Sequence, residues 1–325
     1  MTSETPGWVP DVLGPGFEQL TLALGDDDEG EVVATLVRHR PEPLGEARPA
    51  RAVLAVHGWN DYFFNTEHAR YWTAQGAAFY AIDLRKYGRS LRPHQTPNYV
   101  ADLATYDEDL GAALEEIRVE LGTAVRVMLV GHSTGGLVSV LWADRFPGVV
   151  DSIILNSPWL ELQGTALARF LAAPTVGGLA RYQAKTPLPN LDPGHLARAV
   201  TASWADGGPI DAAWRPNPAF PVRGGWLQAI LQGHARVQRG LDVRAPVLLL
   251  ASARSSIAPR WNDSMLASDS VLDVEAVVAR GHRIGRCVTI VRIEGGLHDL
   301  LLSAAGPRAQ TYAEITRWTA AYGWG

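Results

Sequence analysis

The 325-residue sequence predicts a protein of the α/β class, with a mostly parallel sheet covered by helices on both faces. Short apolar segments rich in β-branched residues alternate with amphipathic, helix-like segments, which is typical of parallel strands buried on both sides. A serine flanked by glycines follows one of these strands and opens a helix-like run. A long stretch without strand-like segments interrupts the alternation once, between two strands of one sheet.

The elements follow one another in a regular order along the chain. FEQLTLAL and EVVATLVRHR flank the acidic segment GDDDEG and predict a β-hairpin with a solvated turn. We then expect strands at 51–58, 77–84, 125–133 and 150–158, with helices around 67–76, 99–121 and 134–146. Strands at 245–253 and 287–296, a short helix near 273–280 and a last helix at 307–322 complete the pattern.

The interruption lies between the strands at 150–158 and 245–253. From Trp159 to Gly240 the sequence is rich in Pro, Gly and Trp and contains short helical stretches without a clear strand. A segment of this length inserted between two strands is best explained as a cap over the strand ends. We therefore expect a core of residues 1–158 and 241–325 and an inserted, mainly helical cap at 159–240.

Composition narrows the class of protein. Hydrophobic residues make up 47% and charged residues 19%, as in a soluble globular protein, and a net charge of −5 argues against a nucleic-acid partner. The single Cys287 cannot form an internal disulfide, which suits a reducing compartment. The N-terminus lacks a signal-peptide pattern, and no run of eighteen apolar residues occurs. We expect a cytoplasmic protein.

The segment GHSTG, residues 131–135, carries the strongest chemical signal. It matches the pattern G-x-S-x-G between a strand and a helix, the context in which this motif forms a sharp turn with an exposed serine hydroxyl. Gly131 and Gly135 are expected where strand and helix pass closely. Ser133 is the candidate nucleophile, and the backbone N–H of Thr134, at the positive end of the helix, is a candidate oxyanion donor.

A serine nucleophile needs a histidine base, and the base needs an orienting acid. After a serine on a turn of this kind, the acid and then the histidine follow along the chain. His298 lies between the last strand and the last helix, where the base is expected, whereas His282 precedes that strand.

The acid should follow the strand at 245–253, and Asp263, Asp269 and Asp273 all qualify. We favour Asp269, because the apolar pair Val271 and Leu272 would anchor its loop. Asp273 resembles a helix N-cap.

The second oxyanion donor should come from the turn after the strand at 51–58. The sequence HGWND places the backbone N–H of Trp59 there. We expect the His57 ring to form hydrogen bonds with the loop backbone. We also expect Asp83 and Arg85 in DLRKYGRS to hold a loop in place by polar contacts.

The motifs HGWND, DLRKYGRS, GHSTGG, SDSVLD and GGLHD together resemble the α/β-hydrolase superfamily, most closely its lysophospholipase and monoacylglycerol lipase branch. The resemblance implies an eight-stranded sheet, a triad of Ser133, Asp269 and His298, and ester hydrolysis through an acyl-enzyme without cofactor or metal. The chain departs from this branch at Asn60, where the branch commonly has a glycine. Ser133 argues against dehalogenases and epoxide hydrolases, which carry an aspartate there.

We therefore expect a serine hydrolase that cleaves carboxylic esters with an apolar acyl chain, as a lysophospholipase, monoacylglycerol lipase or carboxylesterase does. The alternatives are an amidase, aminopeptidase or perhydrolase with the same triad, and a ligand-binding protein that has lost turnover. The expected partner is a small ester or lipid. The segment 165–182, with Phe170 and Leu171, is a candidate for transient contact with a membrane surface. Because Pro174, Gly177 and Gly178 interrupt it, an internal packing face is an equal alternative.

Overall fold

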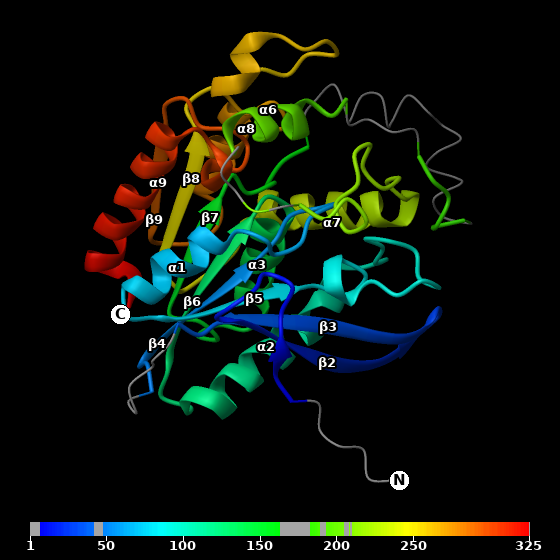
Figure 1. The fold of residues 1–325 in the computed structure, drawn as a ribbon. Helices are drawn as coiled ribbons and strands as arrows, with labels where there is room; N and C mark the ends of the chain where they lie inside the picture. The colour runs from blue at the N-terminus through cyan, green and yellow to red at the C-terminus, as the bar shows by residue number, and fades with distance from the viewer. Residues whose placement is uncertain are drawn as a thin grey trace.

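The computed structural model describes residues 7–41, 48–162, 183–188, 193–204, 208 and 210–324. Within these residues nine strands form one sheet, in the order β1-β2-β3-β5-β4-β6-β7-β8-β9 (Figure 1). The strands are β1 (Val9–Pro10), β2 (Phe17–Asp27), β3 (Gly30–His39), β4 (Arg51–Val56), β5 (Ala78–Asp83), β6 (Arg126–His132), β7 (Ser152–Asn156), β8 (Val247–Ser252) and β9 (Val288–Ile293).

The sheet is antiparallel at one end and parallel elsewhere. The pairs β1–β2, β2–β3 and β3–β5 are antiparallel, and the five pairs from β5–β4 to β8–β9 are parallel. The expected number of eight strands is therefore wrong by one. The additional strand is β1, whose two residues are too short to produce an alternating pattern in the sequence.

The described helices are α1 (Thr66–Ala74), α2 (Tyr106–Leu121), α3 (Thr134–Arg145), α6 (His195–Ser203), α7 (Gly224–Arg239), α8 (Val274–Gly281) and α9 (Ala305–Trp318). Helix α2 begins later than the expected residue 99. The side chain of Asp102 accepts a hydrogen bond from the N–H of Ala104 and caps a separate 3-10 turn, Leu103–Thr105, before α2 starts.

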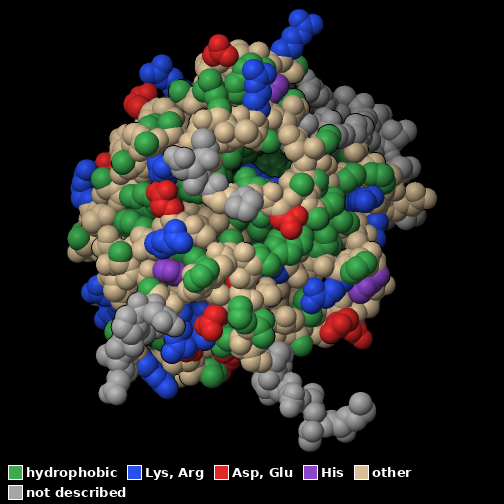
Figure 2. Space-filling model, viewed as in Figure 1, with side chains coloured by type: hydrophobic (Ala, Val, Ile, Leu, Met, Phe, Trp, Pro, Cys, Tyr) green, Lys and Arg blue, Asp and Glu red, His purple; other side chains and the backbone are tan. Residues whose placement is uncertain are grey.

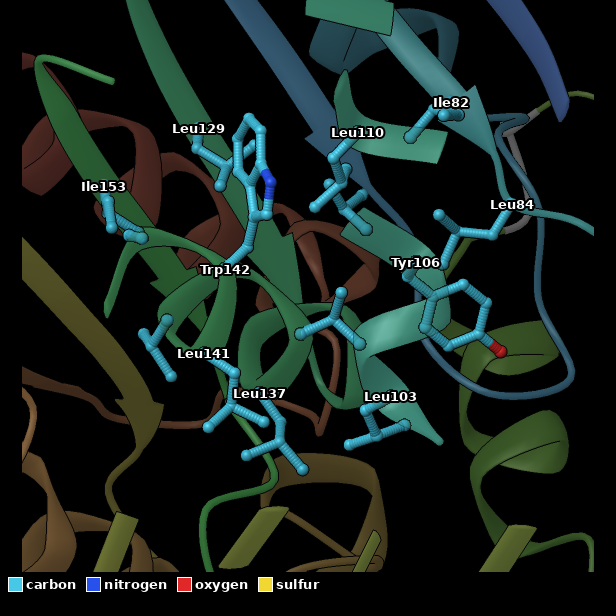
Figure 3. Close-up of a cluster of buried hydrophobic side chains, with 14 of the residues drawn as sticks. Ile82, Leu84, Leu103, Tyr106, Leu110, Leu129, Leu137, Leu141, Trp142 and Ile153 are labelled. Atoms are coloured by element: carbon cyan, nitrogen blue, oxygen red, sulfur yellow. The ribbon is translucent and has the colours of Figure 1, made fainter. Parts of the chain in front are cut away.

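Side chains alternate between the two faces of the sheet and build two apolar clusters. On one face Leu54, Leu129 and Ile153 belong to the cluster formed with α2 and α3, part of which is seen in Figure 3. On the other face Val53 and Met128 belong to the cluster formed with α1 and α9. The central strands are therefore buried on both sides, as their continuous apolar sequences predict.

The acidic turn between β2 and β3 is not simply solvated. The ammonium group of Lys86, a side chain that is 2% exposed, lies 2.5 Å from an Asp27 carboxylate oxygen and 2.7 Å from one of Glu29. Lys185, which belongs to the segment between β7 and β8, lies 2.5 Å from Asp28 and 2.9 Å from Glu29. The tip of the hairpin thus connects two distant parts of the chain.

The segment between β7 and β8 contributes α6 and α7, which lie towards the carboxyl ends of the parallel strands (Figure 1). Helix α7 packs closely on the core, since a Cβ added to Gly233 would lie 3.0–3.3 Å from Leu103, Leu141 and Leu137. The candidate membrane-contact residues Phe170 and Leu171 lie outside the described residues. In the described part of the chain, no helix combines the length and apolar character needed to cross a membrane.

Burial of His68 on α1 predicts a loss of stability in acid. Its Nε2 accepts a hydrogen bond from the indole N–H of Trp72 at 2.8 Å, and burial lowers its pKa to about 4. As pH falls below the unfolded-state value of about 6.5, only the unfolded chain takes up this proton. Between pH 7 and pH 4.5 we expect His68 to account for about 2 to 3 kcal/mol of lost unfolding free energy.

Urea denaturation at both pH values, on the wild type and on His68→Gln, measures this contribution. Glutamine retains an acceptor for Trp72, so the variant should show a smaller pH dependence than the wild type. His282→Gln, at an exposed site, is the matched control. Equal pH dependence in wild type and His68→Gln would rule out this role of His68.

Candidate active site

The turn at Ser133 lies between β6 and α3 and has a strained backbone. Its φ of 50° and ψ of −116° place a non-glycine residue in a sparsely populated conformation, which is typical of functional sites. The Ser133 N–H donates to the Asn156 carbonyl at 3.0 Å, and the Ser133 carbonyl accepts from the Trp159 N–H at 2.9 Å. These hydrogen bonds hold the turn in place.

Glycines on both sides of Ser133 allow β6, α3 and the end of β4 to approach one another. A Cβ added to Gly131 would lie 2.7 Å from the Gly136 Cα and the Ser139 hydroxyl. A Cβ added to Gly135 would collide with the carbonyl oxygens of Val56 and His57. Backbone atoms cannot move aside as side chains do, so only glycine fits at position 135.

The three residues expected to form a triad lie in hydrogen-bonding contact. The Nε2 atom of His298 is 3.0 Å from the Ser133 hydroxyl oxygen, and its Nδ1 is 2.9 Å from Asp269 Oδ2. The other Asp269 oxygen accepts from the N–H groups of Val271 and Leu272, both at 2.8 Å. The Asp269 carboxylate is thus held from both sides, and all three triad side chains are buried.

The other candidate residues for the acid and the base lie elsewhere. The Asp273 carboxylate caps α8 by accepting from the N–H groups of Glu275 and Ala276. Asp263 begins a short 3-10 helix and accepts from the indole N–H of Trp261 at 3.2 Å. His282 follows the last residue of α8.

The loop after β4 carries Trp59 next to the serine turn. A Cβ added to Gly58 would lie 3.2 Å from Ser133 Cβ, so this loop rests against the serine. Thr134 is the first residue of α3, where a backbone N–H has no acceptor within its own helix. The His57 ring bonds loop backbone, with Nδ1 2.7 Å from the Gly58 carbonyl and Nε2 accepting from the Leu84 N–H at 3.1 Å.

Asp83 and Arg85 brace the loop after β5, as the sequence predicts. Asp83 accepts from the Phe63 N–H at 2.8 Å and from the Arg89 guanidinium at 2.8 Å. Arg85 forms an ion pair of 2.7 Å with the buried Asp109 on α2.

Two residues that sequence reasoning missed connect the serine turn to the histidine loop. Asn156, the last residue of β7, donates from Nδ2 to Asp299 Oδ1 at 2.7 Å and accepts at Oδ1 from the Leu300 N–H at 3.1 Å. Burial acts to raise the pKa of Asp299, but attraction to His132 and hydrogen bonds from Asn156 and Leu301 outweigh it and lower the pKa. The one feature of the sequence that points to Asn156 is its position: an amide side chain at the end of the last expected strand before the segment 159–240.

A small cavity of about 60 Å³ borders this network. Its polar wall includes His68, His132, Asn156 and Asp299, and its apolar wall includes Val130. The volume fits about two water molecules. The described residues contain no group of three or more His, Cys, Asp or Glu side chains placed to hold a metal ion.

Figure 2 shows a hollow in the region of α6 and α7, with hydrophobic side chains among those at its wall and rim. Near the serine turn, Trp226 of α7 lies between two tryptophans, with ring centres 5.7 Å from Trp59 and 6.0 Å from Trp159. Trp159 adjoins the site because its N–H donates to the Ser133 carbonyl. Trp59 adjoins it because the preceding residue, Gly58, lies against Ser133.

Comparison with known proteins identifies the family. The sequence model of the Hydrolase_4 family, described as serine aminopeptidase, S33, matches residues 47–303. The chain belongs to this family. The fold is shared with the monoacylglycerol lipase of Paleococcus ferrophilus, whose crystal structure matches with a TM-score of 0.63 at 18% identity over 85% of this chain and 96% of the lipase. The predicted α/β-hydrolase fold is therefore confirmed.

Curated relatives extend this similarity to the sequence. A monoacylglycerol lipase of Mycolicibacterium smegmatis is 26% identical over 219 residues, which cover 65% of this chain and 72% of the lipase. Phospholipase YtpA of Bacillus subtilis is 30% identical over 124 residues, which cover 36% of this chain and 43% of the phospholipase. The expected resemblance to the monoacylglycerol lipase branch is confirmed.

The close approach at Gly135 predicts that even one methyl group is harmful there. Gly135→Ala should lower the free energy of unfolding by about 2 kcal/mol or more, because the new Cβ meets backbone oxygens that cannot relax. Gly111→Ala, in the middle of α2 with open space around its Cβ position, should instead raise stability by about 0.5 to 1 kcal/mol. Thermal and urea melts compare the two variants, and similar effects of the two substitutions would contradict the steric argument.

Proposed function

We propose that the protein is a serine hydrolase that cleaves carboxylic esters with an apolar acyl chain. The observation that carries this proposal is the buried hydrogen-bonded series Asp269–His298–Ser133, with distances of 2.9 Å and 3.0 Å on the two sides of the imidazole. This arrangement supplies a nucleophile, a base and an orienting acid in contact.

In the proposed reaction the Ser133 hydroxyl attacks the ester carbonyl, and His298 Nε2 takes its proton. The N–H groups of Trp59 and Thr134 bind the oxyanion of the tetrahedral intermediate. The C–O bond to the leaving alcohol breaks, His298 returns the proton to the alcohol, and an acyl-enzyme remains on Ser133. Water, deprotonated by His298, then attacks the acyl carbonyl; the bond to the Ser133 oxygen breaks, His298 returns the proton to that oxygen, and the carboxylic acid leaves. Asp269 keeps the proton on Nδ1 and the ring oriented throughout.

The surroundings of the site support an apolar substrate. Trp59, Trp159 and Trp226 lie close together beside the serine, and hydrophobic side chains line the hollow near α6 and α7. Apolar walls with few polar groups are typical of pockets for apolar ligands. The relatives named as a monoacylglycerol lipase and a phospholipase favour the same class of substrate. We propose that residues 159–240 form a cap that selects the acyl chain.

The family description favours a second candidate function, hydrolysis of an amino-terminal peptide bond. An aminopeptidase needs an acidic group available for the substrate amine. Two carboxylates at the proposed cap, 159–240, are already paired with arginines and so are not available for an amine. Glu161 pairs with Arg280, and the Asp61 carboxylate lies 3.2 Å from the Arg215 guanidinium. Amino-acyl p-nitroanilides test this candidate directly, and turnover of these amides in preference to esters would favour the peptidase.

Hydrolysis of p-nitrophenyl esters from acetate to palmitate tests the esterase proposal. The wild type should hydrolyse these esters, and Ser133→Ala should lower kcat by at least about 1000-fold because the nucleophile is gone. A variant that retains wild-type turnover would show that Ser133 is not the nucleophile. The chain length with the highest kcat/KM then describes the acyl pocket.

Asparagine substitutions distinguish the acid of the triad from a neighbouring aspartate. Asp269→Asn should lower kcat by about 1000- to 10,000-fold, because an amide favours the wrong histidine tautomer. Asp273→Asn is the matched control, because asparagine also caps helices, and its kcat should stay near the wild-type value. If Asp273→Asn were the inactive variant, the assignment of the acid would be wrong.

A further inference from the structure

Asn60 occupies a backbone conformation that favours glycine. Its φ is 53°, in the left-handed region, where asparagine is among the few non-glycine residues tolerated. This is the position at which the chain departs from the glycine common in the lipases it resembles. The loop therefore keeps a glycine-like conformation and gains a side chain, which raises the question of what that side chain does.

The Asn60 side chain binds backbone groups more than 150 residues away. Its Nδ2 donates to the Pro216 carbonyl at 3.1 Å, and its Oδ1 accepts from the Phe220 N–H at 3.1 Å. The residue is buried, so both amide atoms are satisfied away from bulk solvent. A glycine at this position would make neither bond.

The two residues that follow Asn60 attach to the same distant segment. The Asp61 carboxylate lies 3.2 Å from the Arg215 guanidinium. The Tyr62 hydroxyl accepts from the Asp211 N–H at 2.8 Å, and its ring packs edge-on against Trp214 at 5.2 Å. Three consecutive residues of the loop after β4 are thus fixed to residues 211–220, which lie within the proposed cap.

We propose that Asn60 is a positioning residue that couples the cap segment 211–220 to the oxyanion-binding N–H of Trp59. Trp59 directly precedes Asn60, so the orientation of its N–H depends on the same backbone turn that the Asn60 side chain anchors. A shift of the cap segment is transmitted through the two Asn60 hydrogen bonds to the donor beside Ser133. This inference rests on the proposed esterase function for its effect on rate, whereas the anchoring itself is independent of that function.

Asn60→Gly tests the coupling without straining the backbone, because glycine adopts the same φ at no steric cost. We expect kcat for p-nitrophenyl ester hydrolysis to fall about 10- to 100-fold, the size expected for a displaced catalytic group, while KM changes little. A purely structural brace would change the melting temperature without this selective loss of kcat.

Asn98→Gly is the matched control. Asn98 is also a buried asparagine with a positive φ, of 60°, but its side-chain amide nitrogen has no hydrogen-bond partner among the described residues. The control should leave kcat unchanged, which separates the loss of the Asn60 side chain from the general effect of introducing a glycine.

Hydrogen exchange of the backbone provides a readout that does not need turnover. Asn60→Gly should raise exchange in residues 59–64 and 211–220, whereas Asn98→Gly should raise it in neither. Faster exchange with a selective loss of kcat supports the proposal. Unchanged exchange, or a kcat equal to that of the wild type, overturns it. If the wild type hydrolysed no ester, the proposed function would fail, and unchanged exchange would separately overturn the anchoring.

Discussion

The groups at the carboxyl edge of the sheet are arranged around the strained backbone of Ser133. A conformation of this kind costs about 1 to 3 kcal/mol and persists only where its surroundings enforce it. Here the Ser133 N–H donates to the carbonyl of Asn156, the last residue of β7. The Ser133 carbonyl accepts a hydrogen bond from the N–H of Trp159, which follows β7. Because the Asn156 side chain also binds Asp299 and the Leu300 N–H, the nucleophile and the histidine loop share one anchor.

Buried charges support the other side of the site. The Arg89 guanidinium, almost fully buried, binds the carboxylates of Asp83 and Asp11 at 2.7–2.9 Å. A buried ion pair of this kind adds little net stability compared with apolar packing, but breaking it leaves an unpaired charge. The network fixes the loop after β5, whose Leu84 N–H in turn holds the His57 ring. The loop that carries Trp59 therefore rests on fixed charges rather than on apolar contacts alone.

The sequence predicts what depends on neighbours in the chain. Apolar periodicity indicates the long strands, and glycine spacing indicates the turn at Ser133. The preference for Asp269 follows from its place before Val271 and Leu272, whose N–H groups do bind the carboxylate. Contacts between distant residues leave no such signal. Asn156 meets Asp299 across 143 residues and Asn60 meets Pro216 across 156, so neither partnership could be predicted from the sequence. A strand as short as β1 carries too little pattern to be recognised.

The hairpin tip limits how this protein can be divided for engineering. In a chimera, the insertion between β7 and β8 would be exchanged as one cassette. In this chain the hairpin carboxylates Asp28 and Glu29 bind Lys185 within the insertion, while Asp27 and Glu29 bind the core residue Lys86. A foreign cassette without a lysine at this place would leave Asp28 without its counter-ion and Glu29 with only one of two. The natural unit of exchange therefore includes the β2–β3 hairpin, although more than one hundred residues separate it from the insertion.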